Sequence, residues 1–306
     1  MDDLLELAEI PNSEEACLIV GWRQWADAGA VSSELPQYLI DQTGARKIGA
    51  IKSDPFYFFQ IPGTQHFLRP EIKLTEGHRA ELRRNKNEIF YADNERKGLF
   101  VFLGDEPHLN IERYAQAFFN LVQELKVKRV AAMGGVYAPV PYDKDRQISC
   151  IYSLPRMKKE LGEYAVRFSN YEGGVTIGSY LSDRAEQLGI EYLVFNAMVP
   201  MYDFSELAPD VERIIIDQDY KAWFDLMRRF NYLFKLGIDL SHLEQQSREL
   251  VNAIAHQIET LEKQAPQAQV REYLAKVNAS FNEPSFMPLD DVWKTGLKDL
   301  FSDSEE

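Results

Sequence analysis

The chain has 306 residues, of which 45% are hydrophobic, and its formal net charge is −14. A chain of this length and composition can bury a full apolar core without a metal or a disulfide, and its negative charge argues against binding to nucleic acid. The first residues, Met1-Asp-Asp, lack the positive charge of a signal peptide, and no stretch reaches the ~18 apolar residues that a membrane span needs. We therefore expect a cytoplasmic protein that does not contact membranes.

Four short apolar runs each end in a small cluster of Gly, Pro, Trp or acidic residues. The runs cover residues 16–20, 99–103, 129–133 and 192–195, and the clusters after them cover residues 21–29, 104–107, 134–141 and 196–200. Short continuous apolar runs are typical of strands that are buried on both faces. Because the loops that leave parallel strands meet at one edge of the sheet, the pattern predicts a binding site at that edge. It does not specify a reaction.

Helical spacing alternates with these runs over the first two thirds of the chain. The expected helices cover residues 29–42, 111–125, 155–161 and 177–188, with one further strand at 47–51. Residues 54–91 are aromatic and irregular, which predicts hairpins or long loops, and their basic run at 79–86 is expected to be a solvated face. The alternation predicts an α/β fold, a three-layer sandwich whose largely parallel or mixed sheet is covered by helices on both faces.

Beyond Pro209 the sequence is helical in character. Aromatic residues recur at three- and four-residue intervals over 220–234, which indicates a helix that packs on the core. Gly237 is expected to stop this helix, and Asp239 or Ser241 to cap the next one.

Two more apolar stripes, at 243–261 and 270–281, predict an antiparallel helical hairpin. Its seam either closes on itself or receives a partner, and Leu250 and Ile254 are the candidate interface residues. The last stretch, 290–306, allows a short amphipathic helix before an acidic end. We expect two parts, an α/β domain at 1–240 and a helical extension with an acidic tail at 241–306.

The sequence gives little support for metal or cofactor chemistry. Its five histidines are spread without metal-ligand spacing, and none of the common nucleophile-elbow, phosphate-loop or dinucleotide-binding motifs is present. Cys17 and Cys150 lie in strand-like apolar settings, where a small buried side chain is expected. We predict no metal site and no cofactor.

The candidate pocket residues come from the clusters that follow the apolar runs. They are Trp22, Trp25, Asp27, Glu106, Gly134 and Gly135. The two glycines either present amides to an anion or permit a tight turn. The two acids either transfer protons or sit at helix N-termini, and the tryptophans form either an exposed binding patch or buried packing.

Several of these clusters, taken in order, resemble the PAC2 family, which is named after a proteasome assembly chaperone. The resemblance covers about residues 16–240. It rests on Gly21-Trp22, Ala26-Asp-Ala-Gly29, Gly104-Asp-Glu-Pro107, Met133-Gly-Gly135 with Pro139-Val-Pro141, Tyr171-Glu-Gly-Gly174 and Ala197-Met-Val-Pro200.

This resemblance implies a three-layer α/β fold similar to that of purine nucleoside phosphorylase, with the helical C-terminal extension found in bacterial members. It also implies a role in assembling proteasome subunits. The chain ends in Ser304-Glu305-Glu306 rather than in the hydrophobic residue and tyrosine of proteasome-engaging members, so docking through the C-terminus is not expected. The favoured hypothesis is a homo-oligomeric, non-enzymatic assembly or interaction protein. The alternative is an enzyme of the nucleoside phosphorylase or hydrolase type whose pocket is lined by Asp27, Glu106, Gly134 and Gly135.

Overall fold

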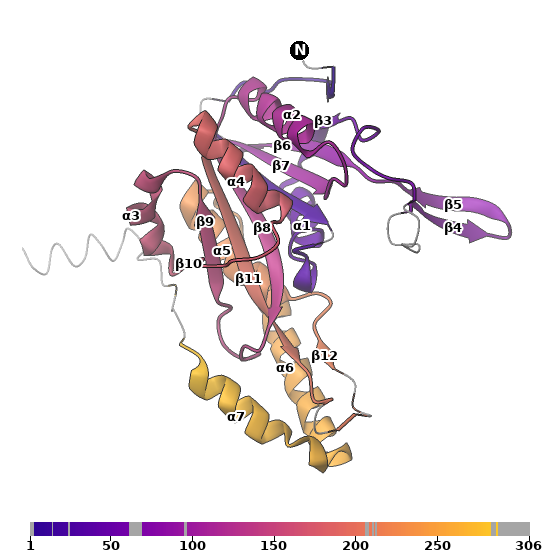
Figure 1. The fold of residues 1–306 in the computed structure, drawn as a ribbon, viewed down its shortest axis with the longest axis vertical. Helices are drawn as coiled ribbons and strands as arrows, with labels where there is room; N and C mark the ends of the chain where they lie inside the picture. The colour runs from indigo at the N-terminus through magenta and orange to yellow at the C-terminus, as the bar shows by residue number, and fades with distance from the viewer. Residues whose placement is uncertain are drawn as a thin grey trace, which may run out of the picture.

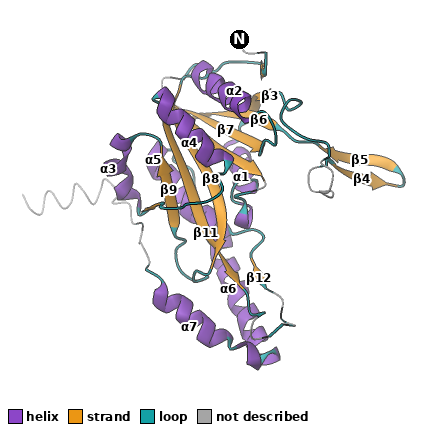
Figure 2. Cartoon of the chain, in the orientation of Figure 1, coloured by secondary structure: helices purple, strands orange, loops and turns teal. Residues whose placement is uncertain are grey.

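The computed structural model describes residues 3–13, 15–23, 25–60, 69–94, 97–205, 208–209, 211, 213–282 and 286. A mixed sheet of ten strands runs through these residues, and helices cover both of its faces (Figures 1 and 2). The expected α/β fold with a parallel or mixed sheet is confirmed.

Four parallel strands form the centre of the sheet. They are, in spatial order, β7 (Lys97–Asp105), β2 (Ala16–Arg23), β8 (Val127–Ala138) and β11 (Glu191–Tyr202). Successive side chains of β2 are buried on both faces, which explains why these strands appear in the sequence as continuous apolar runs. Because the four strands are parallel, their carboxyl ends lie at the same edge of the sheet.

The outer strands make the sheet mixed. On the β7 side the order continues with β6 (Asn87–Asn94), β3 (Arg46–Ile51) and β1 (Leu5–Leu7), and each of these strands is antiparallel to its neighbours. On the other side, β9 (Ile148–Tyr152) is antiparallel to β11, and β10 (Arg167–Phe168) is parallel to β9. The short strand β12 (Ile214–Ile215) also pairs with β11. A separate two-stranded hairpin consists of β4 (Glu71–Thr75) and β5 (His78–Arg83). The hairpin confirms the expectation for residues 71–83, whereas residues 87–91, which were expected in the same irregular region, belong to β6 of the main sheet.

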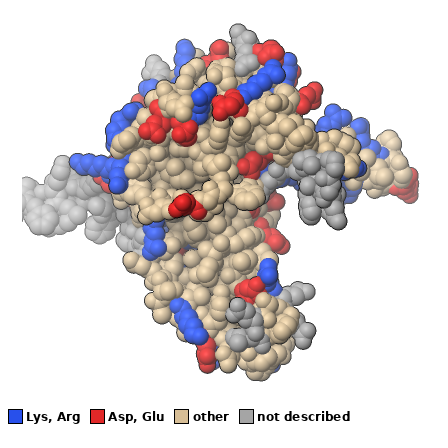
Figure 3. All heavy atoms as spheres, viewed as in Figure 1, with Lys and Arg blue, Asp and Glu red and all other residues tan. Residues whose placement is uncertain are grey.

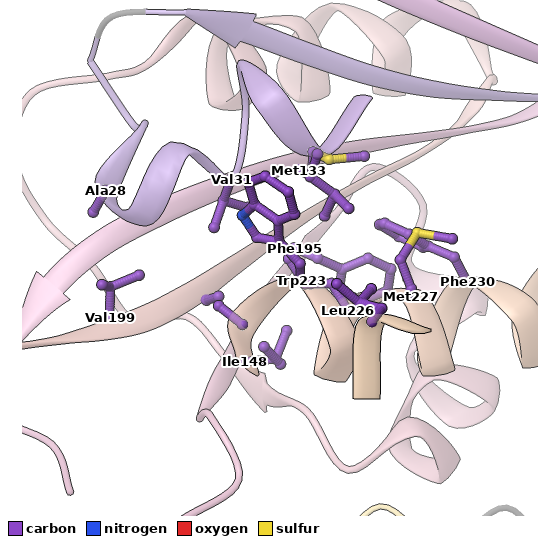
Figure 4. Packing of buried hydrophobic residues seen from close by; sticks show 14 of the residues in the cluster. Ala28, Val31, Met133, Ile148, Phe195, Val199, Trp223, Leu226, Met227 and Phe230 are labelled. Atoms are coloured by element: carbon purple, nitrogen blue, oxygen red, sulfur yellow. The ribbon is translucent and has the colours of Figure 1, made fainter. Parts of the chain in front are cut away.

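The helices form the two outer layers. One face is covered by α2 (Ile111–Glu124) and α4 (Ile177–Leu188), and the other by α1 (Glu34–Thr43) and α5 (Tyr220–Phe234). Short helical segments between them are η1 (Ala28–Ala30), η3 (Pro155–Met157), α3 (Lys158–Leu161) and η4 (Gly162–Tyr164). Figure 4 shows how Trp223, Leu226 and Phe230 of α5 pack on Phe195 of the sheet.

The C-terminal helices belong to the same core as α5. They are α6 (Ser241–Gln264) and α7 (Val270–Ser280), joined by η5 (Pro266–Ala268). Leu243 and Ile258 of α6 are buried in the core that α5 forms with the sheet, and Tyr273 of α7 packs on Tyr202 and Phe204. The C-terminal hairpin is therefore confirmed, whereas the division at residue 240 stays a prediction. Residues 290–306, with the expected acidic end, lie outside the described residues.

The two candidate interface residues lie in an intramolecular seam. Ile254 is only 4% exposed within the core, and Leu250 is half-buried against it. A partner could reach Ile254 only if the helices separated, so this burial argues against the proposed interface.

Three local expectations differ from the structure for identifiable reasons. The first helix begins at Glu34 rather than near residue 29, because Gly29 (φ 64°) and Ala30 (φ 52°) adopt left-handed backbone conformations. Helix α5 ends at Phe234, three residues before the expected stop at Gly237, because Lys235 (φ 54°) already adopts a left-handed backbone conformation. Strands β8 and β11 continue past their apolar runs, so residues expected in strand-end loops lie inside strands.

Candidate functional site

The two tryptophans after the first apolar run have different environments. Trp22 is 5% exposed, packs on Phe102 and Phe118, and donates its indole N–H to the Tyr114 hydroxyl at 2.8 Å. Trp25 is 72% exposed. Trp22 is thus part of the core, and only Trp25 can belong to a surface patch.

We call residues 25–33 the pocket loop. This loop lies directly against β8 at the two paired glycines. The Gly135 amide donates to the Ala26 carbonyl at 2.9 Å, and a Cβ atom at Gly135 would lie 1.9 Å from the Ala28 carbonyl oxygen. A Cβ at Gly134 would lie 2.4 Å from Asn196 Oδ1.

These contacts correct the interpretation of the glycine pair. Gly134 and Gly135 lie within β8 rather than in a tight turn after it, and the Gly135 amide is already bonded to the protein. At Gly135 the missing side chain lets the backbone of the pocket loop approach the strand, and at Gly134 it leaves room for the Asn196 side chain.

Asp27 organises the pocket loop itself. Its Oδ1 atom accepts hydrogen bonds from the backbone amides of Ser32 and Ser33, both at 2.9 Å, and from the Ser32 hydroxyl at 2.9 Å. Burial raises the pKa of Asp27, although the hydrogen bonds with Ser32 and Ser33 oppose this rise. Asp27 therefore satisfies the amides of the turn just before α1, whose N-cap residue is Ser33, and it is not itself the N-cap of that helix.

Glu106 follows β7 and connects the pocket loop to α4. Its Oε1 accepts from the amide of Ile177, the first residue of α4, at 2.8 Å, and its Oε2 accepts from the Trp25 amide at 3.3 Å. Burial raises the pKa of the Glu106 carboxyl. Glu106 therefore interacts with the N-terminus of α4, whereas its position in the sequence indicated the N-terminus of α2.

The other side of the pocket loop is attached to α5. The Gly29 carbonyl accepts from the Asp219 amide at 3.0 Å and from the Trp223 indole N–H at 2.9 Å. Asp219 in turn forms a fully buried ion pair with Arg146, whose Nε lies 2.8 Å from Asp219 Oδ2. In Figure 4, Trp223 lies beside Val31 of the same loop.

A cavity of about 430 Å³ lies beside the pocket loop. The cavity is on the α4 side of the sheet. Alternate residues of a strand point to the same face, and Tyr192 and Val194 of β11 face α2 and α4, so Asn196 and Met198, which line the cavity, lie on that face too. Its lining consists of Trp25, Ala26, Asp27, Ala28, Gly135, Val136, Tyr137, Ser149, Ile151, Ser169, Tyr171, Gly174, Thr176, Ser179, Asn196 and Met198.

The predicted pocket residues do not share this cavity. Trp25, Asp27 and Gly135 line it, whereas Trp22 and Glu106 line a second cavity of only about 20 Å³, and Gly134 lies behind in β8. The two cavities share Ala26, Thr176 and Asn196 in their walls, but Asp27, Glu106, Gly134 and Gly135 do not together line either of them.

Sequence reasoning missed about half of the cavity wall. Ser149 and Ile151 come from β9, and Tyr171 to Thr176 form the loop before α4. The Tyr171-Glu-Gly-Gly174 and Asn196-Ala-Met-Val-Pro200 clusters contained this signal, but nothing in the sequence showed that they face the pocket loop.

The cavity combines a few polar groups with an apolar rim. Its polar groups are the Asp27 carboxyl, the Asn196 amide and hydroxyls such as that of Ser149, and its rim carries exposed aromatic rings. Among the described residues no cluster of three or more His, Cys, Asp or Glu side chains could hold a metal ion. No helix in the described part of the chain is long and apolar enough to cross a membrane.

The fold matches several solved structures at low sequence identity. A PAC2 family protein from Streptomyces avermitilis is 19% identical with a TM-score of 0.68, and the match covers 85% of this chain and 99% of that one. A proteasome-assembly chaperone homologue from Mycobacterium tuberculosis is 20% identical with a TM-score of 0.66, with 78% and 94% covered. The proteasome activator PbaB from Pyrococcus furiosus is 17% identical with a TM-score of 0.59, with 83% and 98% covered.

No curated protein sequence matches the chain. The sequence model of the PAC2 family, in contrast, matches residues 21–258, which include the whole pocket loop, the parallel strands β7, β8 and β11, and most of α6. This match extends over more than three quarters of the 306 residues, and the chain therefore belongs to the PAC2 family.

Proposed function

We propose that this protein is a non-enzymatic assembly factor that acts in the cytoplasm and binds a subunit of a proteasome-like or other multi-subunit complex. Membership of the PAC2 family supports this role, as does the similarity in fold to a proteasome-assembly chaperone homologue and to a proteasome activator. The docking site that we propose is the 430 Å³ cavity together with its rim.

The observation that carries the proposal is the distribution of exposed apolar side chains. Eleven large hydrophobic residues in the described part of the chain are exposed, and four of them line this cavity: Trp25, Val136, Tyr137 and Tyr171. A fifth, Val175, lies between two lining residues. Apolar residues gathered at one site indicate an interaction surface, because scattered ones need no explanation.

The rim has the chemistry of a protein-binding site. Trp25 and Tyr171 are each 72% exposed, and aromatic residues dominate the energetics of protein interfaces because they bury a large rigid area. A cavity of this size can accept one or two apolar side chains of a partner segment. The Asn196 amide and the Ser149 hydroxyl can bond to the backbone of that segment.

The acidic residues near the cavity are used to build it. Glu106 accepts a backbone hydrogen bond at each of its oxygens, and Asp27 Oδ1 accepts three hydrogen bonds. These bonds hold the pocket loop in place, and they favour a binding role for the site over proton transfer.

Affinity purification from the native cells tests the proposal. We expect the tagged wild-type protein to retain stoichiometric subunits of a complex, and a Trp25→Ser/Tyr171→Ser variant to lose them at least tenfold in quantitative mass spectrometry. The matched control is Leu188→Ser, because Leu188 is also exposed but lies at the end of α4, away from the cavity.

Two results would contradict the proposal. One is equal recovery of partners by the wild type and the rim variant. The other is a clear rise in the thermal stability of the wild type with nucleosides or phosphate, because a ligand that binds only the folded state must stabilise it.

A further inference from the structure

The hairpin of β4 and β5 projects from the body of the protein as an arm (Figure 1). We define the arm as residues 69–86. Among the described residues, β4 and β5 pair only with each other, and every residue of the two strands except Leu82 is exposed. A two-stranded hairpin on its own is at best marginally stable in water. Among the described residues, strands β4 and β5 therefore have no surface of their own chain to pack against.

One side of the arm is apolar. Ile72 and Leu74, which are 58% and 56% exposed, lie two residues apart on β4 and so point to the same side. Leu82 is paired directly with Ile72 across the hairpin and adds to this side. The three side chains form an apolar strip long enough to lie on another protein surface.

The charge of the arm is opposite to that of the rest of the chain. Its cations are Arg69, Lys73, Arg79, Arg83, Arg84 and Lys86, and its anions are Glu71, Glu76 and Glu81. The arm thus carries a net charge of +3 within a chain of −14, which leaves −17 on the remaining residues. Figure 3 shows Lys and Arg side chains gathered on the arm.

We propose that the arm packs on the acidic body of a second copy of this chain. The charges of arm and body are complementary, and complementary fields favour association and fix its orientation. In a two-fold dimer the arm of each copy would contact the body of the other, so the dimer would contain two identical contacts between an arm and a body. The body's charge of −17 disfavours a nucleic-acid partner for the same arm, because it would repel phosphates.

The native mass measured by light scattering tests this proposal. The chain has a mass of 35.3 kDa, and we expect the wild type to have at least twice that mass at micromolar concentration in low salt. An Ile72→Ser/Leu74→Ser variant is expected to fall to 35.3 kDa. Leu188→Ser is the matched control and is expected to keep the wild-type mass. Raising the salt to 1 M is expected to shift the wild type toward the monomer, since the contact is partly ionic.

Hydrogen exchange provides a second readout that does not depend on a variant. Amides of residues 71–83 are expected to be protected at high protein concentration and to lose protection at least tenfold on dilution, while β2 and β8 keep theirs. A monomeric wild type, an arm variant of unchanged mass, or arm amides with concentration-independent exchange would each overturn the proposal. The rim variant Trp25→Ser/Tyr171→Ser is expected to keep the oligomer, so the arm and the pocket can be judged separately.

Discussion

The pocket loop is held from two sides by contacts of different kinds. On the α5 side, the Gly29 carbonyl accepts two hydrogen bonds, from Asp219 and Trp223, and Asp219 is fully buried with Arg146. On the α4 side, the half-buried carboxylate of Glu106 accepts the amides of Trp25 and Ile177. The α5 side therefore depends on the buried ion pair of Asp219 and Arg146, and the α4 side depends on the half-buried Glu106 carboxylate alone.

This difference predicts a cavity with one fixed wall and one adjustable wall. Breaking a buried ion pair leaves an uncompensated charge, which is strongly unfavourable, so the α5 side must stay closed in the folded state. Hydrogen bonds at the solvent edge open at lower cost. We expect the Trp25 end of the pocket loop to adapt to a partner while the Gly29 end stays in place.

The largest expected effect comes from removing Arg146. Besides its ion pair with Asp219, Arg146 donates its amide to Asp225 at 2.7 Å and its Nη1 to the Tyr142 carbonyl at 2.9 Å. Arg146→Ala leaves Asp219 buried without its counter-charge and is expected to lower the free energy of unfolding by about 3–5 kcal/mol. Urea denaturation measures this loss.

Arg129→Ala is the matched control. Arg129 also pairs with two carboxylates, Glu160 and Glu191, at 2.7 Å, but this network is partly exposed. Its loss is expected to cost about 1 kcal/mol or less. If the two variants lose similar amounts, the buried pair does not make the α5 side the stronger one.

A smaller effect is expected at the junction of the pocket loop and β8. In Gly135→Ala the new Cβ would lie 1.9 Å from the Ala28 carbonyl oxygen, so the backbone of the loop must move. We expect a loss of about 1–3 kcal/mol, together with a weakened partner interaction through the displaced loop. Gly162→Ala, where no atom lies within 4 Å of the added Cβ, is expected to change stability by less than about 0.5 kcal/mol. Equal stabilities for the two variants would show that the close approach is not needed.

The elements that could be predicted from sequence are those whose signal is local. The apolar runs of β2 and β7 and the helical stripes of α4 and α5 gave both type and approximate position, because burial on both faces and helical amphipathicity leave regular patterns. The edge of the sheet where loops gather followed from parallel strands alone.

The arrangement of the site depends on contacts distant in sequence, and these could not be predicted. Glu106 accepts a hydrogen bond from the first amide of α4, 71 residues later in the chain, and the Gly135 amide donates to the Ala26 carbonyl of the pocket loop. The buried ion pair joins Arg146, which lies in a polar loop, to Asp219 at the start of α5. Neither segment has a local sequence pattern that indicates a buried charge. Residues 134–135 were expected after a strand because the apolar run ends at Met133, but β8 continues to Ala138, and at Gly135 the neighbouring loop requires glycine.

The smallest expected effect concerns the α4 side and its dependence on pH. Burial raises the pKa of Glu106 above its usual 4.5, so the folded state holds the proton more tightly than the unfolded chain does. The stability that this group contributes is present below pH 4.5 and is lost as the pH rises through the raised value. Glu106→Gln does not titrate, so the free energy of unfolding of the wild type is expected to fall relative to that of the variant between pH 4.5 and 7.

Asp239→Asn is the control for this measurement. Hydrogen bonds from Ser241 lower the pKa of Asp239 below its usual 3.8, so most of its titration lies below pH 4.5 and its difference from the wild type is expected to change little above that pH. Other carboxylates with raised pKa values, such as Asp27, titrate equally in the wild type and in the variants and cancel in the differences. The hydrogen bonds from the Ile177 and Trp25 amides oppose the effect of burial on the Glu106 pKa. A flat difference for Glu106→Gln as well would therefore mean that these two bonds fully offset burial, and that the Glu106 bridge holds the α4 side more firmly than an adjustable wall requires.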